Sequence, residues 1–292
     1  MNSFIDEDFL KKLEKLKIAT RKGIQGPQKG EHTSWQSGEG LEFLDYRKYH
    51  PGDDLRYVDW SIYGRLDKLF IKLFHAEKSQ TVHILLDMSR SMNSGTPAKD
   101  ISAKKIAAAL CYIGLSSLDK IGMMAFNHKI IAVKTPMRGK NKYPEAINFL
   151  TALEASEPTD LNACLSEYAL ICKTPGIAIV ISDFFDPKGF RAGLKALVHR
   201  RFDVNLIQLL DYEELVGKQT GNFLLTDIET GEKKRVFIDK HLLALYRRKI
   251  DRFISGIKDQ GRQYGTNYYL YDTRVPFENF IISYFTREAV VH

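Results

Sequence analysis

The sequence predicts an α/β fold built on a doubly wound, mostly parallel β-sheet. Short apolar runs alternate with longer segments of helical spacing from residue 81 onward. Runs that are wholly or largely apolar are typical of strands buried on both faces of a parallel sheet, and they occur at 82–86, 177–181 and 204–210. The segments between strands contain roughly 10–25 residues, which is enough for a helical crossover to a parallel neighbour.

The remaining elements follow in a regular order. Helices are predicted at 97–118, 143–153, 161–172, 187–201, 240–264 and 277–290, and further strands at 121–126 and 267–271. Residues 129–133 follow strand 121–126 after only Asn127-His128, so we predict a short antiparallel edge strand. A hairpin is expected where the runs 222–227 and 234–238 flank Glu229-Thr230-Gly231-Glu232.

The chain is expected to divide at about residue 80. Residues 81–292 form the sheet domain, which carries the hairpin as an insertion around 213–240. Residues 1–80 contain an amphipathic helix at 6–20 and a platform region with a strand at 69–74. A tight turn is predicted in the platform at Pro51-Gly52-Asp53-Asp54, because Pro presets the first turn position and Gly accepts a positive φ.

The composition is that of a soluble globular protein, with 44% hydrophobic and 27% charged residues. Residues 1–17 lack the apolar core of a signal peptide, and no run approaches the roughly 18 apolar residues that a membrane span needs. We therefore expect a cytoplasmic location. The net charge of +7 invites comparison with nucleic-acid-binding proteins, but each third of the chain carries only a small basic excess. Nucleic-acid binding is accordingly not favoured.

Oxygen-bearing side chains follow the strands of the predicted sheet. Asp87, Ser89 and Ser91 come directly after the first strand, Asp183 ends a later one, and Thr159 lies just before a helix. The carboxyl ends of parallel strands meet at one edge of a sheet, so these residues can share one ion. Carboxylates and hydroxyls are hard donors that suit Mg²⁺ or Mn²⁺. Each also has a simpler interpretation: loop or N-cap hydrogen bonding for the first three, a helix cap for Thr159, and a turn acid for Asp183, with Asp186 as the competing carboxylate.

The platform region holds a dense mixture of acid, base and aromatic residues. One interpretation is a folded platform held by Arg–Asp bonds against the main domain, and the other is a surface that recognises a partner. The residues concerned are Asp53, Asp54, Arg56, Asp59 and Trp60.

Motifs for catalysis are missing from the sequence. It has no His-Glu-x-x-His, no Ser nucleophile elbow, no Cys-x-x-Cys pair and no phosphate loop. Asp87 at the end of a strand could serve as the nucleophile of a metal-dependent phosphohydrolase, but such enzymes generally need a second acid two residues later, where this chain has Ser89. We expect no enzymatic activity, with that phosphohydrolase or a weak nucleic-acid-binding protein as the alternatives.

Two family resemblances sharpen this interpretation. Asp87-Met88-Ser89-Arg90-Ser91, Thr159 and Asp183 resemble the metal-ion-dependent adhesion site of von Willebrand factor type A domains. The preceding segment resembles the bacterial family called domain of unknown function fifty-eight, through Gly38-Glu39-Gly40, Glu42-Phe43, Arg47-x-Tyr49, Pro51-Gly52-Asp53-Asp54-x-Arg56 and Asp59-Trp60, and Glu229-Thr230-Gly231-Glu232 also looks like a family feature.

The resemblance implies a type-A-like protein with a divalent metal site and no chemistry of its own. Such proteins usually accompany MoxR-type AAA+ ATPases, so it implies an adaptor or co-chaperone that holds a partner's carboxylate through Mg²⁺ and serves the ATPase and its protein clients. Asp87, Ser89, Ser91, Thr159 and Asp183 would be the metal ligands. Relatives commonly carry Gly-Gly before the threonine, whereas this chain has Glu157-Pro158, which puts direct coordination by Thr159 in doubt.

Overall fold

A computed structural model describes Phe9 and residues 11–16, 42–75, 80–217, 220–226 and 233–291. These residues form two compact units. The larger unit comprises residues 1–26 and 80–292, and the smaller one residues 27–79. Gly38-Glu39-Gly40 and Glu229-Thr230-Gly231-Glu232, which carried part of the family resemblance, lie outside the described residues. In the described part of the chain, no helix combines the length and apolar character that crossing a bilayer requires.

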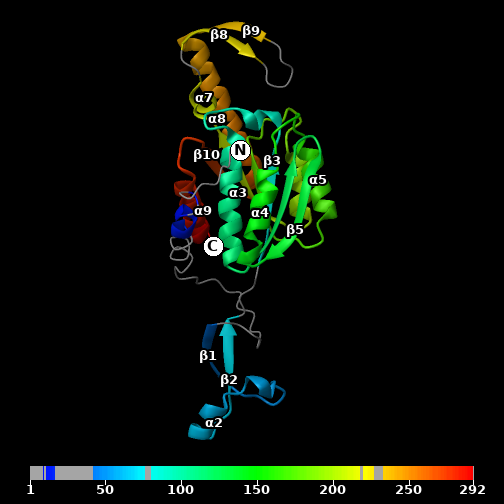
Figure 1. The fold of residues 1–292 in the computed structure, drawn as a ribbon, viewed down its shortest axis with the longest axis vertical. Coiled ribbons are helices and arrows are strands. Elements are labelled where there is room, and N and C mark those ends of the chain that lie inside the picture. Colours follow the sequence, from blue (N-terminus) through cyan, green and yellow to red (C-terminus); the bar gives the residue numbers. More distant parts are fainter. Residues whose placement is uncertain are drawn as a thin grey trace. The chain divides into compact units, whose positions relative to one another are not determined.

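The larger unit is built on a six-stranded sheet with strand order β10-β7-β6-β3-β4-β5 (Figure 1). Every neighbouring pair is parallel except β4–β5, which is antiparallel. The fold is thus the predicted doubly wound, mostly parallel α/β sheet with an antiparallel edge strand. The strands are β3 (Thr81–Asp87), β4 (Lys120–Phe126), β5 (Ile130–Arg138), β6 (Ile177–Ser182), β7 (Asp203–Leu210) and β10 (Asn267–Asp272).

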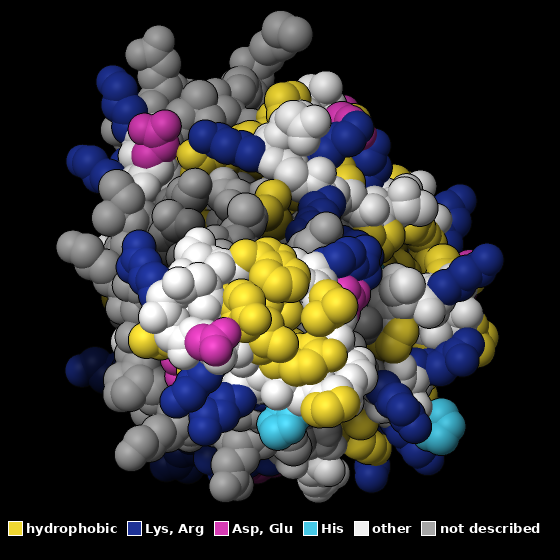
Figure 2. Space-filling view, turned by 90° about the horizontal axis from the view of Figure 1, so that it is seen from below, with side chains coloured by type: hydrophobic (Ala, Val, Ile, Leu, Met, Phe, Trp, Pro, Cys, Tyr) yellow, Lys and Arg dark blue, Asp and Glu magenta, His cyan; other side chains and the backbone are white. Residues whose placement is uncertain are grey.

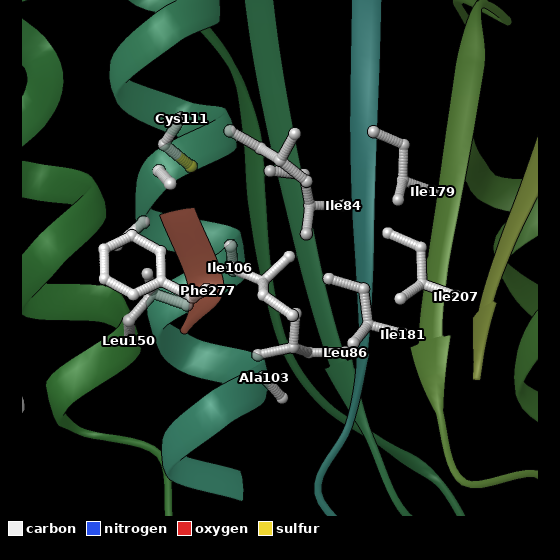
Figure 3. Close-up of a cluster of buried hydrophobic side chains, with 14 of the residues drawn as sticks. Ile84, Leu86, Ala103, Ile106, Cys111, Leu150, Ile179, Ile181, Ile207 and Phe277 are labelled. Atoms are coloured by element: carbon white, nitrogen blue, oxygen red, sulfur yellow. The ribbon is translucent and has the colours of Figure 1, made fainter. Parts of the chain in front are cut away.

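Helices cover both faces of this sheet because successive side chains of each strand point to opposite faces. Ile84 and Leu86 of β3 belong to one buried cluster, together with residues of β6, β7 and three helices (Figure 3). Leu85, between them, belongs to a second cluster on the other face. The first cluster includes residues of α3 (Lys99–Ser116), α4 (Tyr143–Thr151) and α9 (Phe277–Val291), and the second residues of α5 (Leu161–Ile171), α6 (Arg191–His199) and α8 (Lys240–Gln263).

The predicted N-terminal helix packs into the larger unit. Phe9, Leu13 and Leu16 are buried in the same cluster as α3 and α9. The rings of Phe9 and Phe277 lie 5.0 Å apart, and Lys12 Nζ lies 2.9 Å from Glu278 Oε1. The apolar stripe seen in the sequence therefore faces the core, and its lysines face outward or pair with an acid.

A short helix and a hairpin stand between β7 and α8. Helix α7 (Tyr212–Val216) begins at a capping box in which Asp211 accepts from the backbone of α7 and Glu214 accepts from Asp211 N. Strands β8 (Gly221–Thr226) and β9 (Lys233–Ile238) then pair antiparallel at the predicted hairpin position.

The smaller unit is an antiparallel pair, β1 (Glu42–Lys48) and β2 (Phe70–His75), with the 3₁₀ turn η1 (Leu55–Tyr57) and helix α2 (Trp60–Leu66) between them. Val58 and Ile71 form an isolated bridge and are both buried. The sequence did not predict α2. Its N-cap is Asp59, whose Oδ1 accepts from the amides of Ser61 and Ile62.

Candidate functional site

The candidate site lies where the sheet reverses its strand order. From β3 the chain moves to β4 on one side, and later to β6 on the other side of β3. Asp87 is the last residue of β3, and Ser182 is the last of β6, with Asp183 following it. Open α/β sheets form binding sites at such a reversal, outside the carboxyl ends of their strands.

Asp87 is fully buried at this edge. Its Oδ1 accepts from Ser89 N at 2.9 Å, and its Oδ2 accepts from the Ser182 hydroxyl at 2.6 Å and the Thr159 hydroxyl at 3.5 Å. Burial, followed by the negative charge of Asp183, raises the pKa of Asp87 to about 7. A cation beside Asp87 would stabilise its ionised form.

The hydroxyls of the predicted set lie close to this carboxylate and to one another. Ser89 Oγ and Ser91 Oγ are 3.2 Å apart, and Thr159 Oγ1 is buried near Asp87. Neighbouring ligands of an octahedral Mg²⁺, each at about 2.1 Å from the ion, are separated by about 3 Å. The spacing of these oxygens is thus compatible with adjacent positions around one ion.

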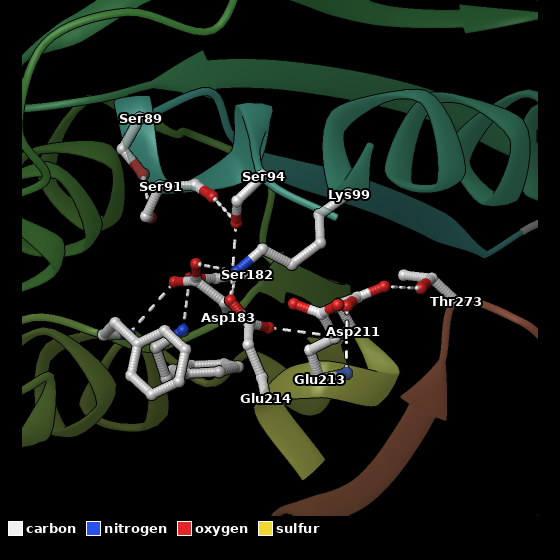
Figure 4. Close-up of polar contacts among 12 residues, drawn as sticks. Ser89, Ser91, Ser94, Lys99, Ser182, Asp183, Asp211, Glu213, Glu214 and Thr273 are labelled. Carbon is white, nitrogen blue, oxygen red and sulfur yellow. Dashed lines mark hydrogen bonds and ion pairs between the residues drawn. The ribbon is translucent and has the colours of Figure 1, made fainter. Parts of the chain in front are cut away.

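Asp183 is held differently from Asp87. It is fully buried, its Oδ1 accepts from Phe185 N at 3.0 Å, and its Oδ2 lies 2.8 Å from Nζ of Lys99. Lys99 is also fully buried, and its Nζ lies 2.5 Å from Glu214 Oε1 (Figure 4). Burial lowers the pKa of Lys99, but Asp183 and Glu214 together outweigh this and hold it above its ordinary value. Lys99 is therefore a charged lysine inside the site.

Two of the alternatives to metal binding, Thr159 as a helix cap and Asp186 as the ligand in place of Asp183, can be checked in the structure. The N-cap of α5 is Asp160, whose side chain accepts from Ala163 N, so Thr159 is not needed as a helix cap. Both oxygens of Asp186, the competing carboxylate, accept backbone amides, from Leu161 and Lys188. Both oxygens of Asp183 are bonded too, by Phe185 N and Lys99 Nζ, and they differ from those of Asp186 in having a charged partner inside the site.

The Glu157-Pro158 departure has a local structural effect. Glu157 adopts a positive φ of 62°, and its carbonyl accepts from Arg90 N at 2.7 Å. Ser156 N donates to Met88 O at 2.9 Å. These two backbone bonds fasten the loop before Thr159 to the loop after β3, and Thr159 Oγ1 still reaches Asp87.

The charge balance of the site suits a divalent cation. Asp87, Asp183 and Glu214 against Lys99 give a formal charge of −2 when all four groups are ionised. Across the part of the chain that the structure describes, no cluster of three or more His, Cys, Asp or Glu side chains could hold a metal. The candidate ligands are instead two carboxylates and three hydroxyls, a set that fits Mg²⁺ or Mn²⁺ completed by water or by a partner.

Three members of this site were not predicted from the sequence. Ser182 donates to Asp87 and accepts from Phe184 N, while buried Lys99 forms an ion pair with the half-buried Glu214. For Lys99 the sequence does hold one indication. A lysine in the first turn of a helix interacts unfavourably with the helix dipole, so its presence there suggests a nearby acid.

The platform residues are in the smaller unit, where the acids serve local structure. Asp53 pairs with Arg47 at 2.8 Å and Asp54 with Arg56 at 2.7 Å, while Asp59 caps α2. Trp60 is different, since 60% of its surface is exposed. Leu55, Tyr63 and Leu66 are exposed as well, and Figure 2 shows hydrophobic side chains gathered on the surface it views.

Comparisons with known proteins extend over most of the chain. "Uncharacterized protein Rv1480" of Mycobacterium tuberculosis and "Uncharacterized protein Mb1516" of Mycobacterium bovis are each 25% identical over 257 residues, covering 84% of this chain and 80% of theirs. Among solved structures, BatB from Bacteroides thetaiotaomicron is 16% identical, with 73% of this chain and 100% of that chain covered and a TM-score of 0.46. The SpRpn10 VWA domain is 9% identical, with 70% and 94% covered and a TM-score of 0.41.

The family model described as "Protein of unknown function DUF58" matches residues 45–252, which include the platform, the candidate site and the hairpin. The chain belongs to the DUF58 family.

Proposed function

We propose that this chain is a non-catalytic, metal-dependent protein-binding module. The observation that supports this best is Asp87, a buried carboxylate surrounded by hydroxyls at the reversal of the sheet, in a site whose formal charge is −2 when its groups are ionised. Asp87, Ser89, Ser91, Thr159 and Asp183 would form the site for Mg²⁺ or Mn²⁺. The bound ion would supply an exchangeable position for the carboxylate of a partner.

The partner we propose is a MoxR-type AAA+ ATPase together with its protein clients, which places the protein in the cytoplasm, where ATP and Mg²⁺ are available. This rests on the family resemblance. Site chemistry agrees with binding rather than catalysis, because the groups that contact Asp87 are hydroxyls and an amide, and none is a second carboxylate two residues later.

Metal binding is tested first, by calorimetric titration of Mg²⁺ and Mn²⁺ into the metal-free chain. Ser91→Ala should weaken binding by about tenfold, since it removes one ligand. Ser255→Ala is the matched control, because that hydroxyl bonds only backbone carbonyls of its own helix. Equal affinity in the wild type and Ser91→Ala would contradict the assigned site.

Partner binding is tested by capture of a purified MoxR-type ATPase from the same organism, with Mg²⁺ and with EDTA. We expect capture in Mg²⁺ and its loss in EDTA or with Asp87→Ala. Capture that is the same in all three conditions would refute a metal-bridged contact. Steady phosphatase turnover that needs both Mg²⁺ and Asp87 would refute the non-catalytic assignment.

The exposed apolar side chains of the smaller unit are proposed as a second contact with the partner. Trp60 and Tyr63 project from α2 with their rings 6.2 Å apart, and both are exposed. Exposed aromatic residues of this kind are enriched among the residues that dominate binding at protein interfaces. Asp53, Asp54 and Arg56 would form the polar rim around them.

A further inference from the structure

A cavity of about 1060 Å³ opens in the larger unit beside the candidate site, with which it shares Glu214. Its walls come from the loop at Ser94, helix α7, strand β9 and the first half of α8. Figure 1 places α7, β9 and this part of α8 together at one end of the unit. None of Asp87, Ser89, Ser91, Thr159 or Asp183 lines it. We refer to it as the α7–α8 groove.

The floor of the groove is apolar and open to solvent. Val236 and Ile238 of β9 line it together with Leu242 and Leu245 of α8. Leu242 is 38% exposed and Leu245 42% exposed. Exposed leucines one helical turn apart form a stripe of the kind that receives another apolar surface.

One side of the groove is strongly basic. Arg248, Lys249 and Arg252 of α8 line it, and none of the three has a carboxylate partner within the part of the chain that the structure describes. Residues 233–252 contain eight Lys or Arg against two Asp, a net charge of +6, whereas the whole chain has +7. Counting charge over thirds of the chain hid this concentration, so the expectation of diffuse charge was wrong.

The acids on the opposite side already have partners. Asp211 caps α7 and accepts from Thr273, while Glu214 pairs with Lys99. Arg274 bonds Asp272 and lies over the Tyr212 ring. With Glu213 the lining holds three acids against four basic groups, a formal charge of +1, and its excess of positive charge lies on α8.

We propose that the α7–α8 groove binds an acidic, amphipathic helix of a partner protein. Its apolar stripe would lie on the leucines and its carboxylates would face Arg248, Lys249 and Arg252. A helix with its side chains is about 10 Å wide and rises about 5.4 Å per turn, so the groove volume accommodates roughly two to three turns. A concave apolar floor suits a helix better than a flat bilayer or a phosphate backbone, which would leave the leucines unfilled.

The test uses a fluorescein-labelled synthetic helix of about four turns, with leucines along one stripe and glutamates elsewhere, and fluorescence anisotropy with the full chain. We expect a Kd of about 10–100 µM at moderate salt, and at least tenfold weaker binding of a matched peptide with lysines in place of glutamates. Binding should be the same in Mg²⁺ and EDTA, since the groove does not use the metal site. A failure of this proposal therefore leaves the proposed function untouched, and the converse also holds.

Two variants test the walls. Arg248→Glu with Arg252→Glu should weaken the acidic peptide at least tenfold, and Leu245→Gln about fivefold. Lys195→Glu with Lys258→Glu is the control, because it reverses two exposed charges that do not line the groove. Far-ultraviolet circular dichroism establishes that each variant is folded.

Three results would overturn the proposal. The first is equal binding of the acidic and basic peptides, or no binding of either. The second is tighter binding of a 20-base-pair duplex (about two helical turns) that depends on the arginines and not on Leu245, which would assign the basic patch to nucleic acid. The third is tighter binding of vesicles rich in phosphatidylglycerol than of the peptide, which would assign it to a membrane surface.

Discussion

Replacement of Lys99 by Met tests whether the buried ammonium balances the carboxylates of the candidate site. Nζ of Lys99 lies 2.8 Å from Asp183 Oδ2 and 2.5 Å from Glu214 Oε1, and Lys99 and Asp183 are fully buried. Met has nearly the same volume, so the substitution removes a charge and leaves little cavity. Removing one partner of a buried ion pair costs about 3–5 kcal/mol, because the other charge remains buried. We expect the free energy of unfolding of the metal-free chain at about pH 7.5 to fall by this amount.

The measurement is chemical denaturation in EDTA, followed by circular dichroism. Lys104→Met is the matched control on the same helix. Nζ of Lys104 lies 3.1 Å from Asp100 Oδ2 and donates to Leu153 O, but both side chains of that pair retain 11% exposure. Because water still reaches the acid, its loss should cost only about 1–2 kcal/mol. A loss in Lys99→Met no larger than in Lys104→Met would refute the charge-balancing role.

The stability of Lys99→Met in the presence of Mg²⁺ provides a second test on the same variant. Without Lys99 the formal charge of the site changes from −2 to −3, so a divalent cation should bind more tightly. Mg²⁺ at a hundred times its Kd stabilises a folded protein by about 2.7 kcal/mol. We expect Mg²⁺ to recover more stability in Lys99→Met than it adds to the wild type. If it recovers none, the metal-site proposal fails even where the charge-balancing role stands.

Three further predictions follow from individual residues. The raised pKa of Asp87 means that the folded state gains a proton before the unfolded state does, so the metal-free wild type should gain stability relative to Asp87→Asn as the pH falls from about 7 to 5, by up to about 1.4 kcal/mol per pH unit. Burial lowers the pKa of His83, so its protonation costs stability in the same pH range, but this cost is common to both chains and is removed when their free energies of unfolding are subtracted. A difference between the two chains, measured by urea denaturation, that does not change with pH would contradict the assignment. Trp60→Ala should leave the free energy of unfolding within about 0.5 kcal/mol of the wild type but weaken capture of the ATPase about tenfold. Leu170→Ala, which truncates another exposed apolar side chain, should leave both the stability and the capture unchanged. Gly176→Ala should lower the free energy of unfolding by at least about 2 kcal/mol, because the added Cβ would collide with the Thr81 carbonyl. Gly256→Ala, whose Cβ would meet open space on α8, should raise it by about 0.5–1 kcal/mol. The same denaturation assay checks both.

The fold could be predicted because its signals are local. The central strands of the large sheet are short apolar runs, and the alternation of Ile84, Leu85 and Leu86 between two buried clusters follows from strand geometry. Helix α8 begins at residue 240 as expected, because Asp239 accepts from Leu242 N as an N-cap and the apolar spacing starts there. Helix α2 was missed because it contains only seven residues, too few for a periodic pattern to stand out.

The candidate site could be predicted only in part. Asp87, Ser89 and Ser91 occur within five residues, and Asp183 follows a strand, so the topology brings them to one edge. Lys99 depends on partners 84 and 115 positions away, and no local spacing records such contacts. The α7–α8 groove was not predicted from the sequence, for another reason. Its charge is concentrated within twenty residues, but its apolar floor exists only once β9 packs beside α8.

The candidate metal site and the α7–α8 groove share one carboxylate. Glu214 lines the groove, and its Oε1 contacts Lys99, while its Oε2 accepts from Asp211 N. Lys99 in turn balances Asp183 beside Asp87. The acidic helix proposed for the groove contacts the leucines and basic groups of α8 and leaves Glu214 bonded to Lys99, so the charge balance at Asp87 does not change. Because linkage is reciprocal, an ion at Asp87 should then leave the affinity of the groove unchanged, as equal peptide binding in Mg²⁺ and EDTA requires.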